Sequence, residues 1–187
     1  ETLRRIIRDK GVESAIIFCN RKKDVDILYK SLTKHGFNAG RLHGDIDQGT
    51  RNETLERFKK GDIGLLVASD VAARGIDVDD LPFVFNFDVP IHSEDYIHRI
   101  GRTGRAGREG NAYTLATPGD GPYVDAIEKL LGNTIPRVEV EGIETLSLEE
   151  GGRRKRRGRT AGGAKGKSER KPAAKSEARP PRKSERA

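Results

Sequence analysis

Cysteine and methionine are almost absent from this chain of 187 residues, and both shortages limit what the protein can be. A single cysteine, Cys19, excludes an internal disulfide bond and favours a reducing compartment, so we expect a cytoplasmic protein. Methionine is missing altogether, so we do not expect Glu1 to be a translational start and interpret the chain as part of a longer protein. No run approaches the roughly 18 apolar residues of a membrane-spanning helix, so no membrane partner is expected.

Acidic and large apolar residues are scarce in the last part of the chain. Residues 151–187 contain 15 Lys or Arg but three Glu, a net charge of +12, whereas the whole chain has 36 basic and 29 acidic residues, a net charge of +7. Residues 1–150 therefore carry a net charge of −5. Because so polar a segment cannot bury enough surface to offset its ordering entropy, we predict a disordered basic tail after a folded domain of residues 1–150. The tail could bind nucleic acid without sequence preference, or it could only solubilise the protein.

Short apolar runs alternate with longer amphipathic segments along the first 131 residues, which predicts an α/β fold with right-handed βαβ units and a parallel sheet. Residues 136–148 alternate only weakly and could form a strand or a strap across the domain. Ligands of such sheets bind beyond the carboxyl ends of the strands. The expected helices are residues 2–10, 22–35, 48–60, 94–100 and 122–131, and the expected strands are residues 14–19, 39–43, 64–68, 83–87 and 111–116.

A regular series of arginines and glycines occupies residues 96–108. Arginine recurs at positions 99, 102, 105 and 108, and glycine at positions 101, 104 and 107. A guanidinium group is permanently charged and donates parallel hydrogen bonds to phosphate oxygens, while glycine lets the backbone approach a ligand closely. The pattern therefore indicates a polyphosphate site, although a solvated basic loop would have a similar composition.

The order His98-Arg-Ile-Gly-Arg-Thr-Gly-Arg105 resembles motif VI of the DEAD-box RNA helicases, which lies in their second RecA-like domain. The resemblance implies a parallel sheet flanked by helices on both faces. It also implies that Arg102 and Arg105 are arginine fingers for the γ-phosphate of ATP held by the first domain, and that His98 couples the two domains. Related DNA-directed helicases usually carry Gln in place of this histidine, so His98 favours RNA. The roles of Arg99 and Arg108 stay open, and both could simply form salt bridges.

The segment Ala68–Val78 resembles motif V of the same family. By resemblance, Asp77 would bind the ATP ribose, Gly75 would lie near the nucleotide, and Ser69 and Asp70 would contact RNA. A carboxylate accepts hydrogen bonds from sugar hydroxyls, and a serine hydroxyl suits a nucleic-acid phosphate. The family usually has Thr at the position of Ser69, so the hydroxyl is kept. Asp70 could equally cap a short helix that follows it.

Two further segments resemble family motifs that contact RNA. Residues 41–51 resemble motif IVa with its Gln-x-x-Arg element, and residues 17–21 match motif IV, although the family often has Thr in place of Arg21. A helix starting near Gln48 would add a partial positive charge favourable to phosphate. His43 is expected to be packed rather than catalytic. The implied RNA-binding residues are Asn20, Arg21, Gly44, Asp45, Gln48 and Arg51.

Two parts of a helicase's ATP site, the phosphate loop and the acidic run that binds Mg²⁺, are missing from this chain. It contains no Asp-Glu-Ala-Asp run to bind Mg²⁺, and the relaxed phosphate-loop pattern at residues 161–168 lies in the polar tail, without the strand and helix that would orient its amides. We therefore expect ATP and Mg²⁺ to be held by an N-terminal RecA-like domain, with no metal ligand in this chain. The fragment alone should not hydrolyse ATP.

Together these features predict the second half of a monomeric ATP-dependent RNA helicase, with RNA and the N-terminal domain as partners. Two alternatives remain open. One is a DNA-directed helicase of the same superfamily, which would prefer DNA as its activator. The other is a non-enzymatic RNA-binding or annealing protein that acts through its tail alone.

Overall fold

The computed structural model describes residues 1–104, 107 and 109–148. The predicted disordered tail, Arg105 and Arg108 therefore lie outside the described residues. None of the described helices is long and apolar enough to cross a bilayer.

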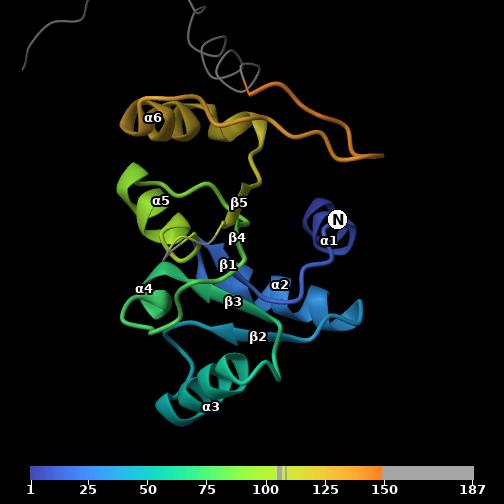
Figure 1. Ribbon diagram of the computed structural model, residues 1–187, viewed down its shortest axis with the longest axis vertical. Helices are drawn as coiled ribbons and strands as arrows, with labels where there is room; N and C mark the ends of the chain where they lie inside the picture. Colours follow the sequence, from blue (N-terminus) through green and yellow to red (C-terminus); the bar gives the residue numbers. More distant parts are fainter. Residues whose placement is uncertain (105–106, 108, 149–187) are drawn as a thin grey trace, which may run out of the picture.

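Five parallel strands form one sheet with the order β2-β3-β1-β4-β5 (Figure 1), which confirms the predicted α/β class and its parallel sheet. Each of the five predicted helices and five predicted strands lies within about two residues of its predicted bounds. The strands are β1 (Ala15–Cys19), β2 (Ala39–Leu42), β3 (Leu65–Ser69), β4 (Phe83–Asn86) and β5 (Asn111–Thr114). The helices are α1 (Thr2–Asp9), α2 (Lys22–Lys34), α3 (Gln48–Lys59), α4 (Asp70–Ala73), α5 (Ser93–Ile100) and α6 (Gly121–Leu131), with a short 3-10 helix at Pro118–Asp120 before α6.

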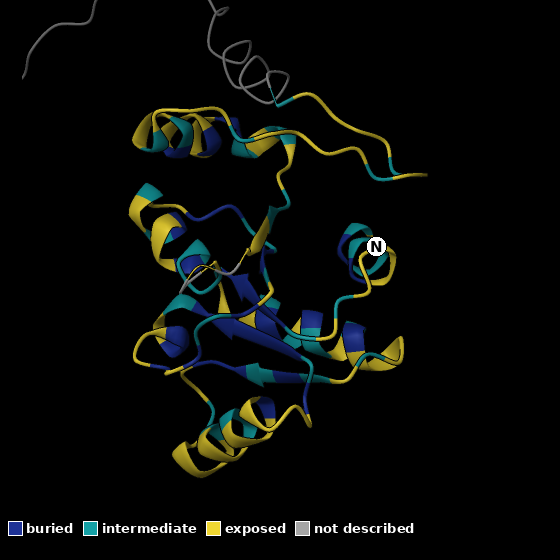
Figure 2. Ribbon diagram, viewed as in Figure 1, coloured by how far each residue is buried: buried dark blue, intermediate teal, exposed yellow. Residues whose placement is uncertain are grey.

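Apolar side chains cover the sheet on both faces, and Figure 2 shows that most of the central part of the sheet is buried. Successive residues of a strand point to opposite faces, so Ile16 packs in one core with Phe58 of α3, and Ile17 packs in the other with Leu28 of α2. All five residues of β1 and of β3 are buried, as expected for central strands covered on both sides. The helices on both faces confirm the RecA-like architecture that the sequence motifs implied.

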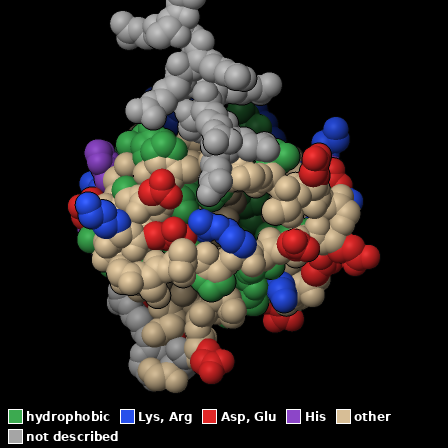
Figure 3. Space-filling view, turned by 90° about the horizontal axis from the view of Figure 1, so that it is seen from above, with side chains coloured by type: hydrophobic (Ala, Val, Ile, Leu, Met, Phe, Trp, Pro, Cys, Tyr) green, Lys and Arg blue, Asp and Glu red, His purple; other side chains and the backbone are tan. Residues whose placement is uncertain are grey.

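The segment after α6 is a strap rather than a strand. Ile135 and Leu148 pack with α5 and α6 around a third apolar cluster, and the guanidinium of Arg5 on α1 donates a 2.6 Å hydrogen bond to the backbone carbonyl of Glu141. Of the two alternatives for residues 136–148, the strap is therefore the one observed. Figure 3 views this side of the molecule, where acidic and basic side chains are interspersed among apolar and neutral atoms.

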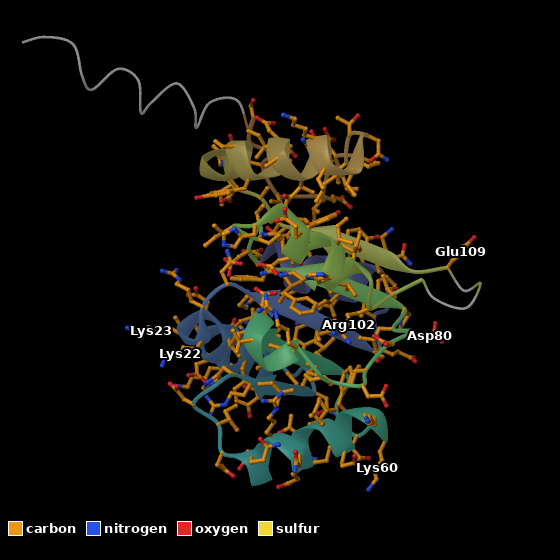
Figure 4. All side chains as sticks on the ribbon, turned by 90° about the vertical axis from the view of Figure 1, so that its left-hand side faces the viewer. Lys22, Lys23, Lys60, Asp80, Arg102 and Glu109 are labelled. Carbon is orange, nitrogen blue, oxygen red and sulfur yellow. The ribbon has the colours of Figure 1, made fainter. Side chains whose placement is uncertain are left out.

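The register of the sheet brings the predicted site loops together. Cys19 pairs with Ser69, and Phe18 pairs with Asn86, so β1, β3 and β4 end at the same level. The residues that follow these strands must then lie side by side at one edge of the sheet. This carboxyl edge lies on the left of Figure 1, next to α4 and α5, and Figure 4 views the molecule from that side.

Candidate functional site

The site is built where the loops after β1, β3 and β4 meet α5 at the carboxyl edge. Asp70 is the first residue of α4, and Ser69 is the residue before the helix, so the prediction that Asp70 caps this helix is wrong. The carboxylate of Asp70 instead pairs with Arg99 of α5, with both oxygens 2.7 Å from guanidinium nitrogens. A bidentate pair of this kind fixes both position and orientation.

Arg99 is the arginine of the 96–108 series whose function the sequence left open. Its side chain is only 1% exposed, and its guanidinium lies 5.3 Å from the centre of the Phe18 ring. Besides Asp70, it binds the side chains of Asn20 and Asn86 and the backbone carbonyl of Asp88. It therefore points into its own domain and cannot reach a nucleotide held elsewhere.

Arg102 lies just beyond the end of α5, and Figure 4 shows it near the middle of the face that presents the carboxyl edge. Its side chain is 20% exposed. The guanidinium donates to the carbonyl oxygen of Ile76 at 2.9 Å and to the carboxylate of Asp79 at 3.1 Å, with a longer contact to the carbonyl of Ala73. In this structure Arg102 thus ties α5 to the loop after α4, and reaching a phosphate would require at least part of this network to open.

A shallow pocket separates this loop from α5. Gly75 has a backbone φ of +74°, a conformation that favours glycine, and it places the chain along the pocket without a side chain. His98 is 73% exposed at the rim, and Asp95 lies near both His98 and the guanidinium of Arg74. The pocket is lined by Arg74, Gly75, Ile97, His98, Gly101 and Arg102.

These lining residues have the chemistry of a polyphosphate site. The guanidinium groups of Arg74 and Arg102 and the imidazole of His98 line the pocket, and Gly75 contributes no side chain that would fill it. Arg74 and Asp95 were not among the predicted site residues, although Arg74 belongs to the Arg-Gly-x-Asp turn of motif V and could have been found there. Arg105 lies outside the described residues.

Asp77 extends away from the domain. Its side chain is 96% exposed, and the Lys59 ammonium of α3 lies 3.8 Å from one carboxylate oxygen. The carboxylate is thus open to a hydroxyl donor such as a ribose. It stands on the same loop as Gly75, which is consistent with the predicted pairing of these two residues at a nucleotide.

The Gln-x-x-Arg element starts α3 as predicted, but its two side chains have different partners. Asp47 caps the helix by accepting a 2.9 Å hydrogen bond from the Thr50 amide, and this bond lowers the pKa of Asp47. Gln48 donates to the side chain of Asn52, whereas Arg51 donates to the carbonyl of Ala72 at the end of α4. Arg51 therefore connects α3 to the site, and Gln48 remains on the surface.

The loop after β2 brings Gly44 and Asp45 to the same edge. Asp45 pairs with the Lys22 ammonium at 2.8 Å, and the hydrogen bond from this lysine lowers the pKa of Asp45. Gly44 has open space where a side chain would be. His43 is buried, with its Nε2 atom 3.2 Å from the Asp26 carboxylate, so the packed role expected for it is confirmed.

Asn20 and Arg21, after β1, differ in orientation. The Asn20 side chain is turned inward, where its amide nitrogen donates to the carbonyl of Val89 and its oxygen accepts from Arg99. Arg21 is 78% exposed and pairs with Asp24 at 2.7 Å. Lys22 and Lys23 follow at the start of α2, and Figure 4 shows both at the margin of this face. Neither lysine was among the predicted site residues, because the motif ends at Arg21.

Comparison with known proteins agrees with this geometry. A family model described as the helicase conserved C-terminal domain matches residues 1–107, which is more than half of the chain. The DEAD-box ATP-dependent RNA helicase CshA of Bacillus subtilis is 44% identical over 156 residues, covering 80% of this chain and 32% of CshA. The chain belongs to the DEAD-box helicase family.

Solved structures of DEAD-box proteins share the fold. Escherichia coli SrmB, in a crystal structure with regulator of ribonuclease activity A, aligns with a TM-score of 0.72 and 35% identity, over 78% of this chain and 88% of that one. Domain 2 of Mss116p, bound to an RNA duplex, aligns with a TM-score of 0.64 and 32% identity, over 75% and 57% of the two chains. This DEAD-box chain spans about a third of the length of the CshA proteins it matches.

In the described part of this DEAD-box domain, no three His, Cys, Asp or Glu side chains converge in a way that could hold a metal ion. The acids near the pocket are instead paired with arginines, as Asp70 is with Arg99 and Asp95 with Arg74. The guanidinium groups of Arg74 and Arg102 are suited to bind anions, and the exposed carboxylate of Asp77 is suited to accept hydrogen bonds from hydroxyl groups.

Proposed function

We propose that this chain is the second half of an ATP-dependent RNA helicase, in which it completes an ATP site and half of an RNA site. The observation that carries the proposal is the convergence of motifs V and VI on one pocket, with Arg74, His98 and Arg102 around it. The ATP-dependent RNA helicases among its relatives support the same activity for the full-length protein.

On the nucleotide side, Arg102 and Arg105 would stabilise the charge that develops on the γ-phosphate, as arginine fingers do. Asp77 would accept hydrogen bonds from the ribose, and Gly75 would let the backbone approach the nucleotide. His98, exposed on α5, would contact the N-terminal RecA-like domain. That domain would hold ATP and Mg²⁺, so this chain by itself would not hydrolyse ATP.

On the RNA side, the loops at the carboxyl edge would hold the phosphate backbone. The exposed guanidinium of Arg21 and the guanidinium of Arg51 supply positive charge, and Gly44 leaves room for close approach. The RNA duplex bound to domain 2 of Mss116p supports RNA as the ligand of this domain. The other side chains assigned to this edge are Asn20, Asp45, Gln48, Ser69 and Asp70.

The two sites would work together when the domains close. ATP and RNA would draw the two RecA-like domains over one another, bending one RNA strand so that it separates from its partner, and hydrolysis would reopen them. The protein would act as a monomer in the cytoplasm. Its tail would add weak, salt-sensitive RNA affinity.

The test joins this chain to the N-terminal domain of its own protein and compares RNA with DNA of equal length as activators of ATP hydrolysis. We expect strong stimulation by RNA, and no hydrolysis by the chain alone. Preferential stimulation by DNA would overturn the assignment to RNA, and full hydrolysis by the isolated chain would overturn the division of the ATP site between two domains.

A further inference from the structure

Arg99 is the most deeply buried charged side chain among the described residues. Burying a charge costs several kcal/mol unless the charge is paired and its hydrogen bonds are made. A guanidinium has five N–H donors, and here five acceptors lie within 3.2 Å. Because every N–H donor of the guanidinium has an acceptor, the surrounding fold fixes the position of the Arg99 side chain more closely than a surface salt bridge would.

The acceptors come from the ends of three different strands. Asn20 follows β1, Asp70 follows β3, and the other two acceptors, Asn86 and the carbonyl of Asp88, belong to β4 and its loop. One side chain of α5 thus holds together the loops that form the proposed RNA edge. Removing it would leave the half-buried carboxylate of Asp70 and the amide oxygens of Asn20 and Asn86 without this donor.

The same helix and the turn that follows it carry the groups that face the nucleotide pocket. His98 precedes Arg99, and Arg102 follows it by three residues, and both line the pocket. Any displacement of the loops that contain Asn20 and Asp70 must move Arg99, because both residues are hydrogen-bonded to it. A movement of Arg99 in turn shifts α5. The hydrogen bonds of Arg99 therefore form a direct physical connection between the RNA edge and the nucleotide pocket.

The hydrogen bonds of Arg99 also occupy the side-chain groups of Asn20 and Asp70 that would otherwise be available to bind RNA. Both carboxylate oxygens of Asp70 bind Arg99, and both ends of the Asn20 amide group are hydrogen-bonded inside the domain. We propose that Arg99 is a positioning residue that couples RNA binding to the nucleotide pocket, and that Asn20 and Asp70 are its anchors rather than RNA ligands. This inference rests on the proposed helicase function.

The test uses the intact two-domain enzyme and the variants Arg99→Lys, Asp70→Asn and their combination. Lysine keeps the charge but lacks the planar fork, so it cannot make the bidentate pair. The rate of ATP hydrolysis is measured as a function of RNA concentration, at a temperature well below the melting temperature of each variant. We expect each single variant to lower kcat at saturating RNA about tenfold or more and to change the KM for RNA less than threefold. The effects of the two substitutions should not add in the double variant, because each substitution breaks the same hydrogen-bond network.

Arg51→Ala provides the contrast, since a phosphate contact at the RNA edge should raise the KM for RNA instead. Arg137→Lys is the matched control, because the exposed Arg137 pairs with Glu128 of α6, and it should leave both parameters unchanged. If Asp70→Asn raises the KM for RNA and leaves kcat intact, Asp70 is an RNA ligand and the inference is wrong. A uniform loss of activity that matches the unfolded fraction, or wild-type kinetics in both single variants, would overturn it too.

Failure of the proposed function has a different signature. Wild-type enzyme that is not stimulated by RNA would contradict the helicase assignment itself, whatever the variants do. If Arg99→Lys does not fold, Asp70→Asn alone decides the inference by the same comparison of kcat with the KM for RNA, because it keeps the size and one oxygen of the original side chain.

Discussion

Among single residues, Cys19 shows how burial controls chemistry. It is fully buried in the core beneath α2, and burial raises the pKa of its thiol well above the usual range. A thiol-specific reagent at pH 8 should therefore leave the folded chain unmodified and should label one thiol per chain in concentrated urea. Rapid labelling of the native chain would show that the carboxyl end of β1 becomes exposed to solvent far more often than this packing implies.

Asp47 gives a prediction with a defined pH dependence. The Thr50 amide lowers its pKa in the folded state, so its stabilising effect is present above the unfolded pKa of about 3.9 and disappears as the pH falls through the folded value. Asp47→Ala should lower the urea midpoint at pH 7, and the difference from wild type should narrow near pH 2.5. A constant difference across this range would exclude the hydrogen-bonded carboxylate as its source.

The site residues differ in how far the sequence could place them. Gly75, Asp77, Gly44 and Arg51 were predicted from motifs, because each motif is a local pattern. The partners of Arg99 could not be found in this way, since Asn20 is 79 residues away and meets it only through the pairing of β1, β3 and β4. The inward orientation of Asn20 and Asp70 is a consequence of that distant contact.

At the scale of helices and strands, Gly64 is a point where two segments meet. A Cβ atom at Gly64, just before β3, would overlap the backbone carbonyl oxygen of Glu13, just before β1. Gly64→Ala should therefore lower the free energy of unfolding by about 1–3 kcal/mol, as overpacking against backbone does. Urea titration followed by circular dichroism measures the change.

Gly44→Ala is the matched control, because the corresponding space at Gly44 is empty. It should keep wild-type stability but weaken RNA binding by the two-domain enzyme if RNA approaches the backbone there. Equal stability of the two alanine variants would contradict the close packing of β3 against the segment before β1.

The elements themselves were predictable because their signals are local. Apolar runs of four to six residues mark the buried strands, and glycines such as Gly36 and Gly61, both with positive φ, follow the ends of α2 and α3. The segment after α6 carried no clear period. Its strap form depends on Ile135 and Leu148 reaching the apolar cluster of α5 and α6, which is tertiary information.

At the scale of the whole molecule, the charge distribution allows the RNA affinity proposed for the tail to be distinguished from that proposed for the folded domain. Residues 151–187 carry a net charge of +12, and the rest of the chain carries −5. Deleting the tail from the two-domain enzyme should make RNA binding weaker and less dependent on salt. The slope of log K against log salt should become shallower by about 0.7 for every phosphate of a single strand that the tail had neutralised.

RNA binding that depends on ATP should survive deletion of the tail, because we assign this binding to the loops at the carboxyl edge of the sheet. The measurement is a salt titration of RNA binding with and without an ATP analogue. Complete loss of RNA binding without the tail would favour a protein that binds RNA through its tail alone.

The central claim is that Arg102 completes a nucleotide site provided by another domain. Arg102→Ala in the intact two-domain protein should lower RNA-stimulated ATP hydrolysis on the order of a thousandfold, as loss of an arginine finger does. Arg137→Ala, which removes an exposed arginine from the α6 side, should retain full turnover. Unchanged RNA-stimulated turnover in folded Arg102→Ala would contradict the claim, and it would leave Arg102 only the role of tying α5 to the Ile76 and Asp79 loop.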